Sequence, residues 1–347
     1  MRIVVLAGGT STERDVSISS GILVASALRE KGHEVVLLDV FRGYEQDICD
    51  VDALFKENYS FTDSVKVGET ISDIDEVREE RRDKSNRYIG ENVIDICQCA
   101  DITFLALHGG AGENGQVQAV LDLMGLKYTG SGYLGSALAM HKGITKSVLI
   151  QSKVLTPAGE IFKTAEDALS WKQFPCVVKP CSGGSSVGIT IAQNAEEYKA
   201  SVKEAFRYGE DEIVVEEYIK GREFSVGLLG GRALPPIEII PNEGFYDYKT
   251  KYQVGAARDV CPADITEEED RTMREAAEAA YDALRLESYA RVDFILAEDG
   301  KAYCLEANTL PGMTPTSLLP QEAKVEGISY PDLCEKIIEI SMKKYNK

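Results

Sequence analysis

Residues 290–308 read ARVDFILAEDGKAYCLEAN, two runs of alternating apolar and polar side chains on either side of Asp299-Gly300. Alternation with a period of two is typical of β-strands, and Asp-Gly is a strong signal for a two-residue hairpin turn. The sequence therefore predicts an antiparallel hairpin in which Glu298 pairs with Lys301.

The register of this hairpin gathers oxygen ligands on one face. Counting outward from the turn places Asp293 opposite Glu306, and Arg291 opposite Asn308. Two opposed carboxylates repel each other unless a cation lies nearby. Oxygen ligands grouped in this way suit Mg²⁺ that bridges phosphate groups; exposure to solvent, or neutralisation by Arg291 alone, is the alternative. The segment 309–312 that follows, TLPG, is typical of a rigid site loop.

The N-terminal segment predicts a βαβ unit. Residues 3–6 and 35–40 are apolar runs, and the amphipathic stretch 16–28 between them ends near Gly32. Strand, helix and strand in this order open a parallel sheet. The loop 8–12 stands where a dinucleotide fingerprint would stand, but the GxGxxG spacing is absent, which argues against a nicotinamide-dependent dehydrogenase.

Two further glycine-rich loops follow apolar strands. The strand 102–107 runs into HGGAGENG, residues 108–115, and such strand ends are where α/β proteins bind ligands. The loop 181–188, CSGGSSVG, is followed by another strand pattern, so it is expected at the tip of a hairpin and cannot be a Walker-type loop. Its backbone N–H groups can still cover phosphates, and Lys179 before it supplies a positive charge.

The composition is that of an acidic globular protein with more than one domain. The 347 residues exceed the size of a single core, and 44% hydrophobic with 27% charged residues exclude wholesale disorder. With 38 Lys and Arg against 57 Asp and Glu the net charge is −19, which argues against nucleic acid or an anionic membrane as partner. No apolar run approaches the roughly 18 residues of a membrane span. The scattered cysteines contain no CxxC pair, so we expect buried, reduced thiols in a cytoplasmic protein.

The order of segments predicts three domains, 1–130, 131–216 and 217–347. Residues 42–92 are highly charged and weakly periodic, and we expect a solvated helical insertion there. Thr266 begins a helix in the third domain, because a glutamate three residues later gives capping-box spacing.

Taken together and in order, these motifs resemble the D-alanine–D-alanine ligases of the ATP-grasp superfamily. The resemblance covers nearly the whole chain apart from the insertion. Its carriers are GGTSTERDVS (8–17), LHG (107–109) with GENG (112–115), GSSVG (184–188), YDY (246–248) with KY (251–252), RVD (291–293), and LEANT (305–309) with PGM (311–313).

The resemblance implies an α/β fold, in which an N-terminal parallel-sheet βαβ domain is followed by two α+β domains that clasp ATP between them. It implies a ligase that phosphorylates the carboxylate of one D-alanine with ATP. The amine of a second D-alanine then attacks the acylphosphate, which gives D-alanyl-D-alanine, ADP and phosphate for peptidoglycan precursor synthesis. Two Mg²⁺ ions, with Mn²⁺ as the alternative, and a cytoplasmic homodimer without nucleic-acid or membrane partners are also implied.

The same resemblance implies roles for single residues. Those matched to catalysis are Glu13, Ser185, Tyr252, Arg291 and Gly312. Those matched to substrate binding are Glu13, His108, Arg291, Ser317 and Leu318, the last two for the second carboxylate. Those matched to ATP are Lys142, Lys179, Ser185, Ser186, Glu216, Tyr218, Ile219, Glu223 and Lys251. Those matched to the two Mg²⁺ ions are Asp293, Glu306 and Asn308.

The residues leave some alternatives open. Tyr252 is the residue expected of peptide-forming members, whereas members that form D-alanine–D-lactate carry histidine there. Asn114 departs from the more usual Glu-Asp-Gly triplet. A D-alanine–D-serine ligase, or an ATP-grasp ligase for another carboxylate and amine, remains an alternative. A non-catalytic nucleotide-binding module is disfavoured by the complete set Arg291, Asp293, Glu306 and Asn308.

Overall fold

The chain divides into two compact units, each built from separated parts of the sequence. The computed structural model describes residues 1–48, 50–63, 73–184, 188–207, 211–241 and 257–346. Unit 1 comprises Met1–Leu134, Glu287–Ala290 and Thr309–Lys347. Unit 2 comprises Gly135–Leu286 and Arg291–Asn308. The division into three domains stays a prediction.

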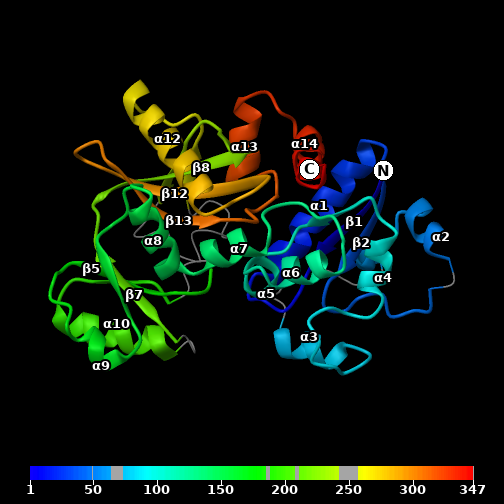
Figure 1. Ribbon diagram of the computed structural model, residues 1–347, viewed down its shortest axis with the longest axis horizontal. Helices are drawn as coiled ribbons and strands as arrows, with labels where there is room; N and C mark the ends of the chain where they lie inside the picture. Colours follow the sequence, from blue (N-terminus) through cyan, green and yellow to red (C-terminus); the bar gives the residue numbers. More distant parts are fainter. Residues whose placement is uncertain (49, 64–72, 185–187, 208–210, 242–256, 347) are drawn as a thin grey trace. The chain divides into compact units, whose positions relative to one another are not determined.

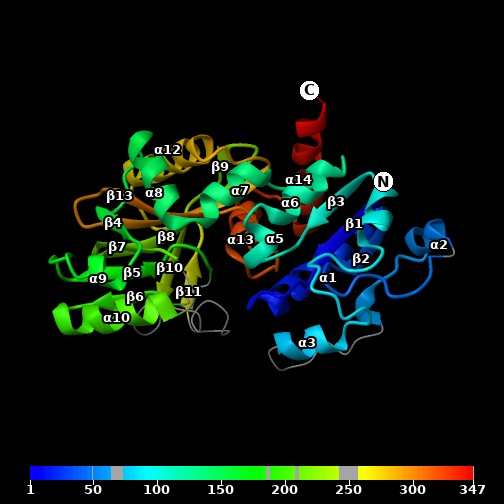
Figure 2. The ribbon, with the colours of Figure 1, turned by 60° about the horizontal axis from the view of Figure 1, so that its bottom comes forward.

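Unit 1 is built on a parallel sheet with the strand order β2-β1-β3. Figure 1 labels β1 and β2, and Figure 2 labels all three strands. The predicted βαβ unit is confirmed: Ile3 pairs with Val35 and with Ile102, and α1 packs on β1 and β2. The last long helix of the chain, α14, contacts α1 and β3. The elements are β1 (Arg2–Ala7), α1 (Arg14–Glu30), β2 (Glu34–Asp39), α2 (Val51–Lys56), η1 (Phe61–Asp63), α3 (Ile74–Glu80), α4 (Val93–Gln98), β3 (Ile102–Leu105), α5 (Gly110–Glu113), α6 (Gln116–Leu123), α13 (Leu318–Val325), α14 (Tyr330–Met342) and η2 (Lys343–Tyr345).

The described part of the insertion 42–92 does more than decorate the surface. Phe55 and Arg81 are 0% and 1% exposed. The guanidinium of Arg81 lies 4.6 Å from the ring centroid of Phe41 and 2.8 Å from the carboxylate of Asp83. The expectation of a solvated segment is wrong for these residues, because a ring and a carboxylate cover the guanidinium and make its burial tolerable.

Unit 2 contains two antiparallel sheets, one with the order β4-β7-β5-β6 and one with the order β11-β10-β8-β12-β13, in which β9 pairs with β8. The strand pair β5–β6 confirms that the loop 181–188 joins two antiparallel strands. The elements are α7 (Tyr133–Met140), α8 (Lys142–Gln151), β4 (Gly159–Phe162), α9 (Ala165–Ala168), β5 (Cys176–Pro180), β6 (Thr190–Ala192), α10 (Ala195–Arg207), β7 (Ile213–Glu217), β8 (Gly221–Leu229), β9 (Arg232–Ala233), β10 (Ile237–Pro241), β11 (Ala257–Val260), α12 (Glu267–Ala283), β12 (Tyr289–Ala297) and β13 (Ala302–Asn308).

Amphipathic helices cover both sheets of unit 2. Tyr198 and Val202 on α10 are buried with Val178 of β5, and Figure 2 shows α10 running along that sheet. The helix α12 packs on β8, β9 and β13. Its predicted capping box is confirmed, since Thr266 and Glu269 exchange side-chain to backbone hydrogen bonds.

The expectation of buried thiols holds for most cysteines of the described residues. Those buried are Cys97, Cys176, Cys181, Cys304 and Cys334, whereas Cys99 is exposed. Burial raises the pKa of the Cys97 thiol to about 12, which keeps it protonated near neutrality. Among the described residues, no helix has the length and apolar character needed to cross a membrane.

The turn of the β12–β13 hairpin differs from the prediction. The Ala297 N–H donates to the Lys301 carbonyl at 2.9 Å, so the loop contains three residues, 298–300. Gly300 in this loop has a φ of +79°, which a three-residue hairpin loop requires at its last position. The two-residue turn, with Glu298 paired to Lys301, is therefore wrong.

A β-bulge restores the register at the far end of the hairpin. Phe294 pairs with Cys304 while Asp293 pairs with Glu306, so Leu305 is an extra residue on β13. The longer loop and the bulge shift the pairing by one residue in opposite directions. The predicted pairings of Asp293 with Glu306, and of Arg291 with Asn308, are confirmed.

Candidate functional site

The hairpin face of unit 2 presents two carboxylates that are each held by a cation. Arg291 donates from Nε and Nη2 to the two oxygens of Asp293, both at 2.9 Å. Nζ of Lys142 lies 3.4 Å from Oε2 of Glu306. These cations offset the repulsion expected between opposed carboxylates, so the face is electrically balanced before any ligand binds.

Two more side chains fix the orientation of Asp293, which is only 6% exposed. The Ser225 hydroxyl donates to Oδ1 at 2.7 Å, and Nδ2 of Asn308 donates to Oδ2 at 3.1 Å. The sequence prediction missed Ser225. It lies two residues after Glu223 on β8 and hence on the same face, so strand periodicity from that predicted residue could have found it.

The donor set of this face fits Mg²⁺. All three predicted ligands offer oxygen, and Asn308 can turn its amide oxygen toward a cation while its nitrogen stays on Asp293. Asp293 and Glu306 lie directly opposite each other on neighbouring strands. The residues therefore match the hard, oxygen-rich environment that Mg²⁺ prefers.

A second charged cluster in unit 2 is almost fully buried. Glu216 is 3% exposed, lies 2.9 Å from Nζ of Lys146, and forms a second ion pair with Lys179. Burial alone would raise the pKa of Glu216, but the two ammonium groups outweigh burial and lower the pKa below its ordinary value. One carboxylate between two lysines leaves the cluster with excess positive charge.

The first residue of α8, Lys142, is tied to the predicted phosphate loop. Its backbone N–H donates to the Cys181 carbonyl at 2.7 Å, and its Nζ donates to the Gly183 carbonyl at 2.8 Å. The prediction named Lys142 but did not name Lys146, one turn later on the same helix. Lys146 is 6% exposed and belongs to the buried cluster.

The remaining predicted ATP residues follow β7. Tyr218 is 38% exposed and Ile219 is half-buried in the segment that leads into β8, where Glu223 is also half-buried. The predictions for Ser185, Ser186, Lys251 and Tyr252 lie outside the described residues.

In unit 1, Glu13 lies against the glycine-rich loop after β3. It is 9% exposed, and its backbone N–H donates to the Ser11 hydroxyl at 3.2 Å. A Cβ on Gly109 would be 2.5 Å from Oε2 of Glu13, and Gly109 has a φ of +66°. Glycine is therefore required at this position for the loop to approach the carboxylate.

The ring of His108 is held through both nitrogens. Nδ1 lies 3.0 Å from the Leu310 carbonyl, and Nε2 lies 3.2 Å from the Ser20 hydroxyl. A carbonyl only accepts, so Nδ1 carries a proton and, in the neutral ring, Nε2 accepts from Ser20. Ser20 was not predicted, although it lies two helical turns after Glu13 along α1.

Gly312, Ser317 and Leu318 lie together at the start of α13. Ser317 occupies the N-cap position, and a Cβ on Gly312 would be 2.7 Å from its hydroxyl oxygen. Leu318 is 7% exposed. Backbone N–H groups at a helix start favour a negatively charged ligand, as the second carboxylate would be.

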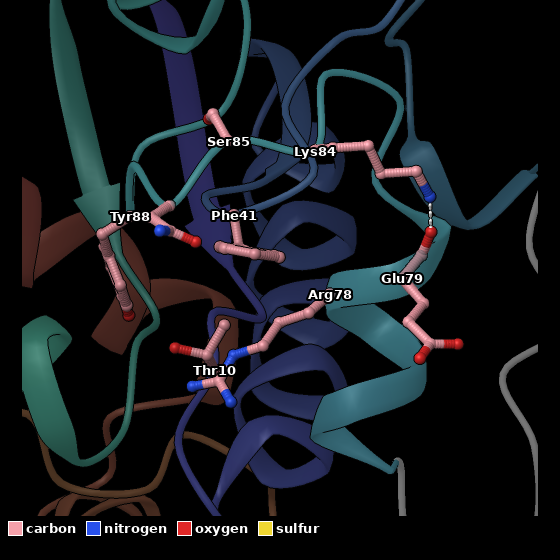
Figure 3. Close-up of a pocket in the computed structure, with 8 residues that line it drawn as sticks. Thr10, Phe41, Arg78, Glu79, Lys84, Ser85 and Tyr88 are labelled. Carbon is pink, nitrogen blue, oxygen red and sulfur yellow. Dashed lines mark hydrogen bonds between the residues drawn. The ribbon is translucent and has the colours of Figure 1, made fainter.

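Unit 1 also contains a cavity of about 660 Å³ beside the N-terminal glycine loop (Figure 3). Thr10, Phe41 and Tyr88 line it together with Arg78 and Lys84 of the insertion. Although Thr10 belongs to the motif 8–17, no residue that lines the cavity has a predicted role in the site.

The chain is similar over its whole length to D-alanine–D-alanine ligases. A family model described as D-ala D-ala ligase N-terminus matches residues 2–131, and one described as D-ala D-ala ligase C-terminus matches residues 146–339. The D-alanine–D-alanine ligase of Pediococcus pentosaceus is 46% identical over 352 residues, which cover 100% of this chain and 99% of the relative. That of Lacticaseibacillus casei is 43% identical over 348 residues, with coverage of 99% and 97%.

Solved structures agree with these sequence matches. The D-alanine–D-alanine ligase from Bacillus anthracis complexed with ATP is 31% identical, with a TM-score of 0.74 and coverage of 99% of this chain and 97% of that chain. The D-alanine–D-alanine ligase from Coxiella burnetii is 26% identical, with a TM-score of 0.74 and coverage of 100% and 95%.

Proposed function

The chain belongs to the D-alanine–D-alanine ligase family, and on that premise we propose how its own residues join two D-alanine molecules in an ATP-dependent reaction. The first D-alanine is phosphorylated on its carboxylate, and the amine of the second attacks the acylphosphate and expels phosphate. The product, D-alanyl-D-alanine, serves peptidoglycan precursor synthesis. The observation that carries the residue-level proposal is the single hairpin face that holds Arg291, Asp293, Glu306 and Asn308.

ATP binding falls to residues of unit 2. The excess positive charge of the cluster of Lys146, Lys179 and Glu216 suits phosphate oxygens, and Lys142 adds a further cation at the phosphate loop. Tyr218, Ile219 and Glu223 are the proposed contacts of the adenine and ribose of ATP. Ser185, Ser186 and Lys251 complete this set as proposed contacts to the phosphates.

Asp293, Glu306 and Asn308 would hold Mg²⁺, or Mn²⁺ in its place. Bound there, the cation supplies positive charge that neutralises phosphate oxygens during phosphoryl transfer. Arg291 stays beside Asp293 and offers the remaining positive charge to the oxyanion that forms when the amine attacks. The Gly312 N–H is the proposed second donor to that oxyanion.

Residues of unit 1, together with Tyr252, are the proposed contacts of the amino-acid substrates. Glu13 supplies the negative charge that the ammonium group of the first D-alanine requires, in a proposed network with Ser185 and Tyr252. His108 is the proposed contact of the first carboxyl group, and Ser20 and Leu310 orient its ring. The start of α13, with Ser317 and Leu318, receives the second carboxylate.

Three broader features belong to the same proposal. The enzyme acts in the cytoplasm, where ATP is supplied, and it assembles as a homodimer, which light scattering of the purified protein would test. The chain comprises the domains 1–130, 131–216 and 217–347, whose boundaries limited proteolysis would test. D-Serine as second substrate is the alternative, and the ratio of kcat/KM for D-alanine and D-serine decides between them.

The decisive experiment measures ADP release from ATP and Mg²⁺, with and without D-alanine, together with mass spectrometry of the product. We expect ADP release that depends on D-alanine and a product with the mass of the dipeptide. ADP release that is independent of D-alanine, or a product other than the dipeptide, would contradict the proposal.

A further inference from the structure

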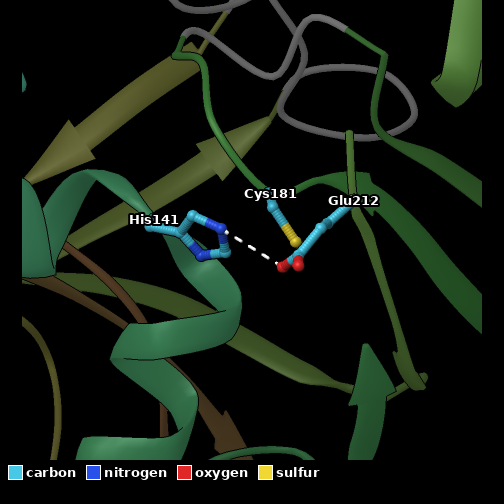
Figure 4. Close-up of side chains that lie close together, drawn as sticks. All are labelled: His141, Cys181 and Glu212. Atoms are coloured by element: carbon cyan, nitrogen blue, oxygen red, sulfur yellow. Dashed lines mark ion pairs between the residues drawn. The ribbon is translucent and has the colours of Figure 1, made fainter. Parts of the chain in front are cut away.

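A second group of metal-ligating side chains in unit 2 has no role in the reaction proposed above. His141, Cys181 and Glu212 each offer one donor atom, and the three atoms lie within 4.8 Å of one another. Figure 4 shows the three side chains converging from the residue before α8, the residue after β5 and the residue before β7. The closeness of these donor atoms is the first feature that suits a cation site.

The spacing of the histidine and the glutamate suits a shared cation. Nε2 of His141 and Oε2 of Glu212 are 3.4 Å apart. Nitrogen and oxygen ligands of a tetrahedral zinc ion are about 3.4 Å apart for metal–ligand bonds of about 2.0–2.1 Å, whereas a direct N–H···O bond is about 2.9 Å long. The observed distance therefore matches the edge of a zinc tetrahedron better than it matches a hydrogen bond.

The three side chains are only partly buried as a group, so a cation can reach them from solvent. Cys181 is 1% exposed, while the side chains of His141 and Glu212 are each 24% exposed. Lys163 occupies only the other carboxylate oxygen, Oε1 of Glu212, at 3.0 Å, and its side chain is 78% exposed. A cation from solvent would thus first reach the partly exposed side chains of His141 and Glu212, and then the buried sulfur of Cys181.

The donor types select the cation. Thiolate sulfur and imidazole nitrogen are ligands that Zn²⁺ prefers, whereas Mg²⁺ prefers oxygen. We propose that His141, Cys181 and Glu212 form a binding site for a thiophilic divalent cation, with Zn²⁺ as its occupant. This site is distinct in chemistry from the all-oxygen set of Asp293, Glu306 and Asn308.

Binding at this site moves two protons. The Ile144 N–H donates to Nδ1 of His141 at 3.2 Å, so the neutral ring carries its proton on Nε2. When the cation bonds to Nε2, that proton moves to Nδ1 and Ile144 loses its acceptor. The Cys181 thiol releases its proton to solvent as the sulfur–metal bond forms. One proton is released for each cation bound, and two anionic ligands balance the charge of the cation.

The site acts on the start of the helix that carries Lys142. The Lys142 N–H donates to the Cys181 carbonyl at 2.7 Å, and the Cys181 N–H donates to the Glu212 carbonyl at 3.2 Å. A cation that joins all three side chains therefore crosslinks the first turn of α8 to the beginning of the phosphate loop, while it removes the N-terminal cap from Ile144.

Cobalt(II) is the probe for this site, because a cobalt–thiolate bond gives a near-ultraviolet charge-transfer band that oxygen ligands do not give. The full-length protein is titrated with Co²⁺ in excess Mg²⁺, and Zn²⁺ is then added in competition. We expect one equivalent of Co²⁺ with a thiolate band, and loss of the band on addition of Zn²⁺. His141→Asn keeps an acceptor for Ile144 but removes the ligand, and it weakens binding by more than about 10-fold. Cys181→Ser abolishes the band.

Two variants serve as matched controls. His33→Asn alters a pair of nearly the same spacing, since Nε2 of His33 lies 3.5 Å from the Glu335 carboxylate. Cys99→Ser removes the exposed thiol. Both should leave the titration unchanged. A wild-type protein without the thiolate band, a band that persists in Cys181→Ser, or equal losses in His33→Asn and His141→Asn would overturn the proposal. If Cys181→Ser fails to fold, the comparison of the two histidine variants decides.

Discussion

The two charged clusters of unit 2 differ in their net charge and in how deeply their side chains are buried. On the hairpin face, two carboxylates face two cations, and the side chains of Glu306 and Arg291 are 23% and 17% exposed. In the buried cluster, a single carboxylate, Glu216, faces Lys146 and Lys179, and its side chain is 3% exposed. On the hairpin face, a metal ion can replace a lysine or arginine side chain as the partner of a carboxylate. The buried cluster cannot exchange Glu216 without leaving two ammonium groups unpaired.

We infer from this difference that the hairpin face takes part in the reaction, whereas the Glu216 carboxylate mainly neutralises the two buried lysines. Removing negative charge from the hairpin face should affect turnover more than folding. Although Asp293 is buried, Glu306 and Arg291 keep some access to solvent, and Lys142 keeps its hydrogen bond to the Gly183 carbonyl. Removing the one carboxylate of the buried cluster should affect folding, because two desolvated cations then lose their counterion. The predictions below test this separation, beginning with the largest effect.

The double substitution Asp293→Asn with Glu306→Gln should abolish Mg²⁺-dependent turnover, with a fall in kcat of about 10³-fold or more. The amides keep the shape of the side chains but no longer attract a divalent cation. Steady-state ADP release over a range of Mg²⁺ concentrations measures the effect. The matched control is Glu298→Gln with Asp299→Asn in the loop of the same hairpin, where both side chains are at least half exposed. Normal turnover in the first variant would refute the metal role.

Glu216→Gln should lower the free energy of unfolding by about 3 kcal/mol, because Lys146 and Lys179 are left without a counterion. The pKa of Glu216 is lowered in the folded protein from an ordinary value of 4.5, so its stabilising effect is present above pH 4.5 and is lost as the pH falls further. Denaturant unfolding at pH 7 and below pH 4.5 measures both effects, and the gap between wild type and variant should narrow in acid.

The control for this stability prediction is Glu298→Gln. It removes a surface pair with Lys220, in which the two side chains are 78% and 80% exposed. An exposed pair contributes at most about 1 kcal/mol, so this variant should unfold almost as the wild type does. Equal losses in the two variants would show that burial of Glu216 does not set its contribution.

Ser225→Ala should raise the Mg²⁺ concentration required for half-maximal rate by about 10-fold, because a hydroxyl that orients a metal-binding carboxylate is lost. Folding should change little, since Arg291 and Asn308 still donate to Asp293. Ser201→Ala is the control, because Ser201 is also buried but donates to a helix carbonyl, that of Glu197. Identical Mg²⁺ dependence in Ser225→Ala and the wild type would show that Ser225 does not position Asp293.

The hairpin shows how much of the fold the sequence could predict. Strand alternation predicted β12, β13 and the pairing of Asp293 with Glu306, because side-chain period and strand pairing are local properties. The turn was wrong by one residue, and the bulge at Leu305 compensated for that error. Neither feature could be read from the pattern, since Asp-Gly occurs in two-residue and in three-residue loops. The correct register therefore depended on two deviations that cancel.

The candidate site could be predicted where a residue belongs to a motif and could not where tertiary packing decides. Lys146 looks like a solvated helix residue, because nothing near it in sequence reveals that Glu216 lies beside it. Arg14 lies within a quoted motif, yet it donates to the Gly9 carbonyl at 2.6 Å and forms a buried ion pair with Asp39. Its contacts hold the loop in shape, which a motif match alone does not reveal.

Lys344 extends the comparison to a partly buried lysine in unit 1 whose ammonium group donates to a carbonyl, that of Gly130, at 2.6 Å. The rings of Tyr128 and Tyr345 lie 4.5 and 5.4 Å from it. Burial lowers the pKa of Lys344 from 10.5 to about 8, although the charges of Glu287 and Asp122 act in the opposite direction. Lys344 should therefore release its proton at a lower pH than an ordinary lysine does.

The sign of the expected pH effect follows from that pKa. Between about pH 8 and 10 the unfolded chain still binds the proton that folded Lys344 has released, so stability rises with pH. The rise is at most about 1.4 kcal/mol per pH unit for one proton, and Lys344→Met should lack it. Denaturant unfolding of both proteins across this range measures the difference, in which the titration of cysteines and tyrosines largely cancels. The exposed neighbour Lys343, changed to Met, should retain the wild-type slope. Equal slopes in wild type and Lys344→Met would mean that the carbonyl and the two rings stabilise the ammonium group as well as a carboxylate does.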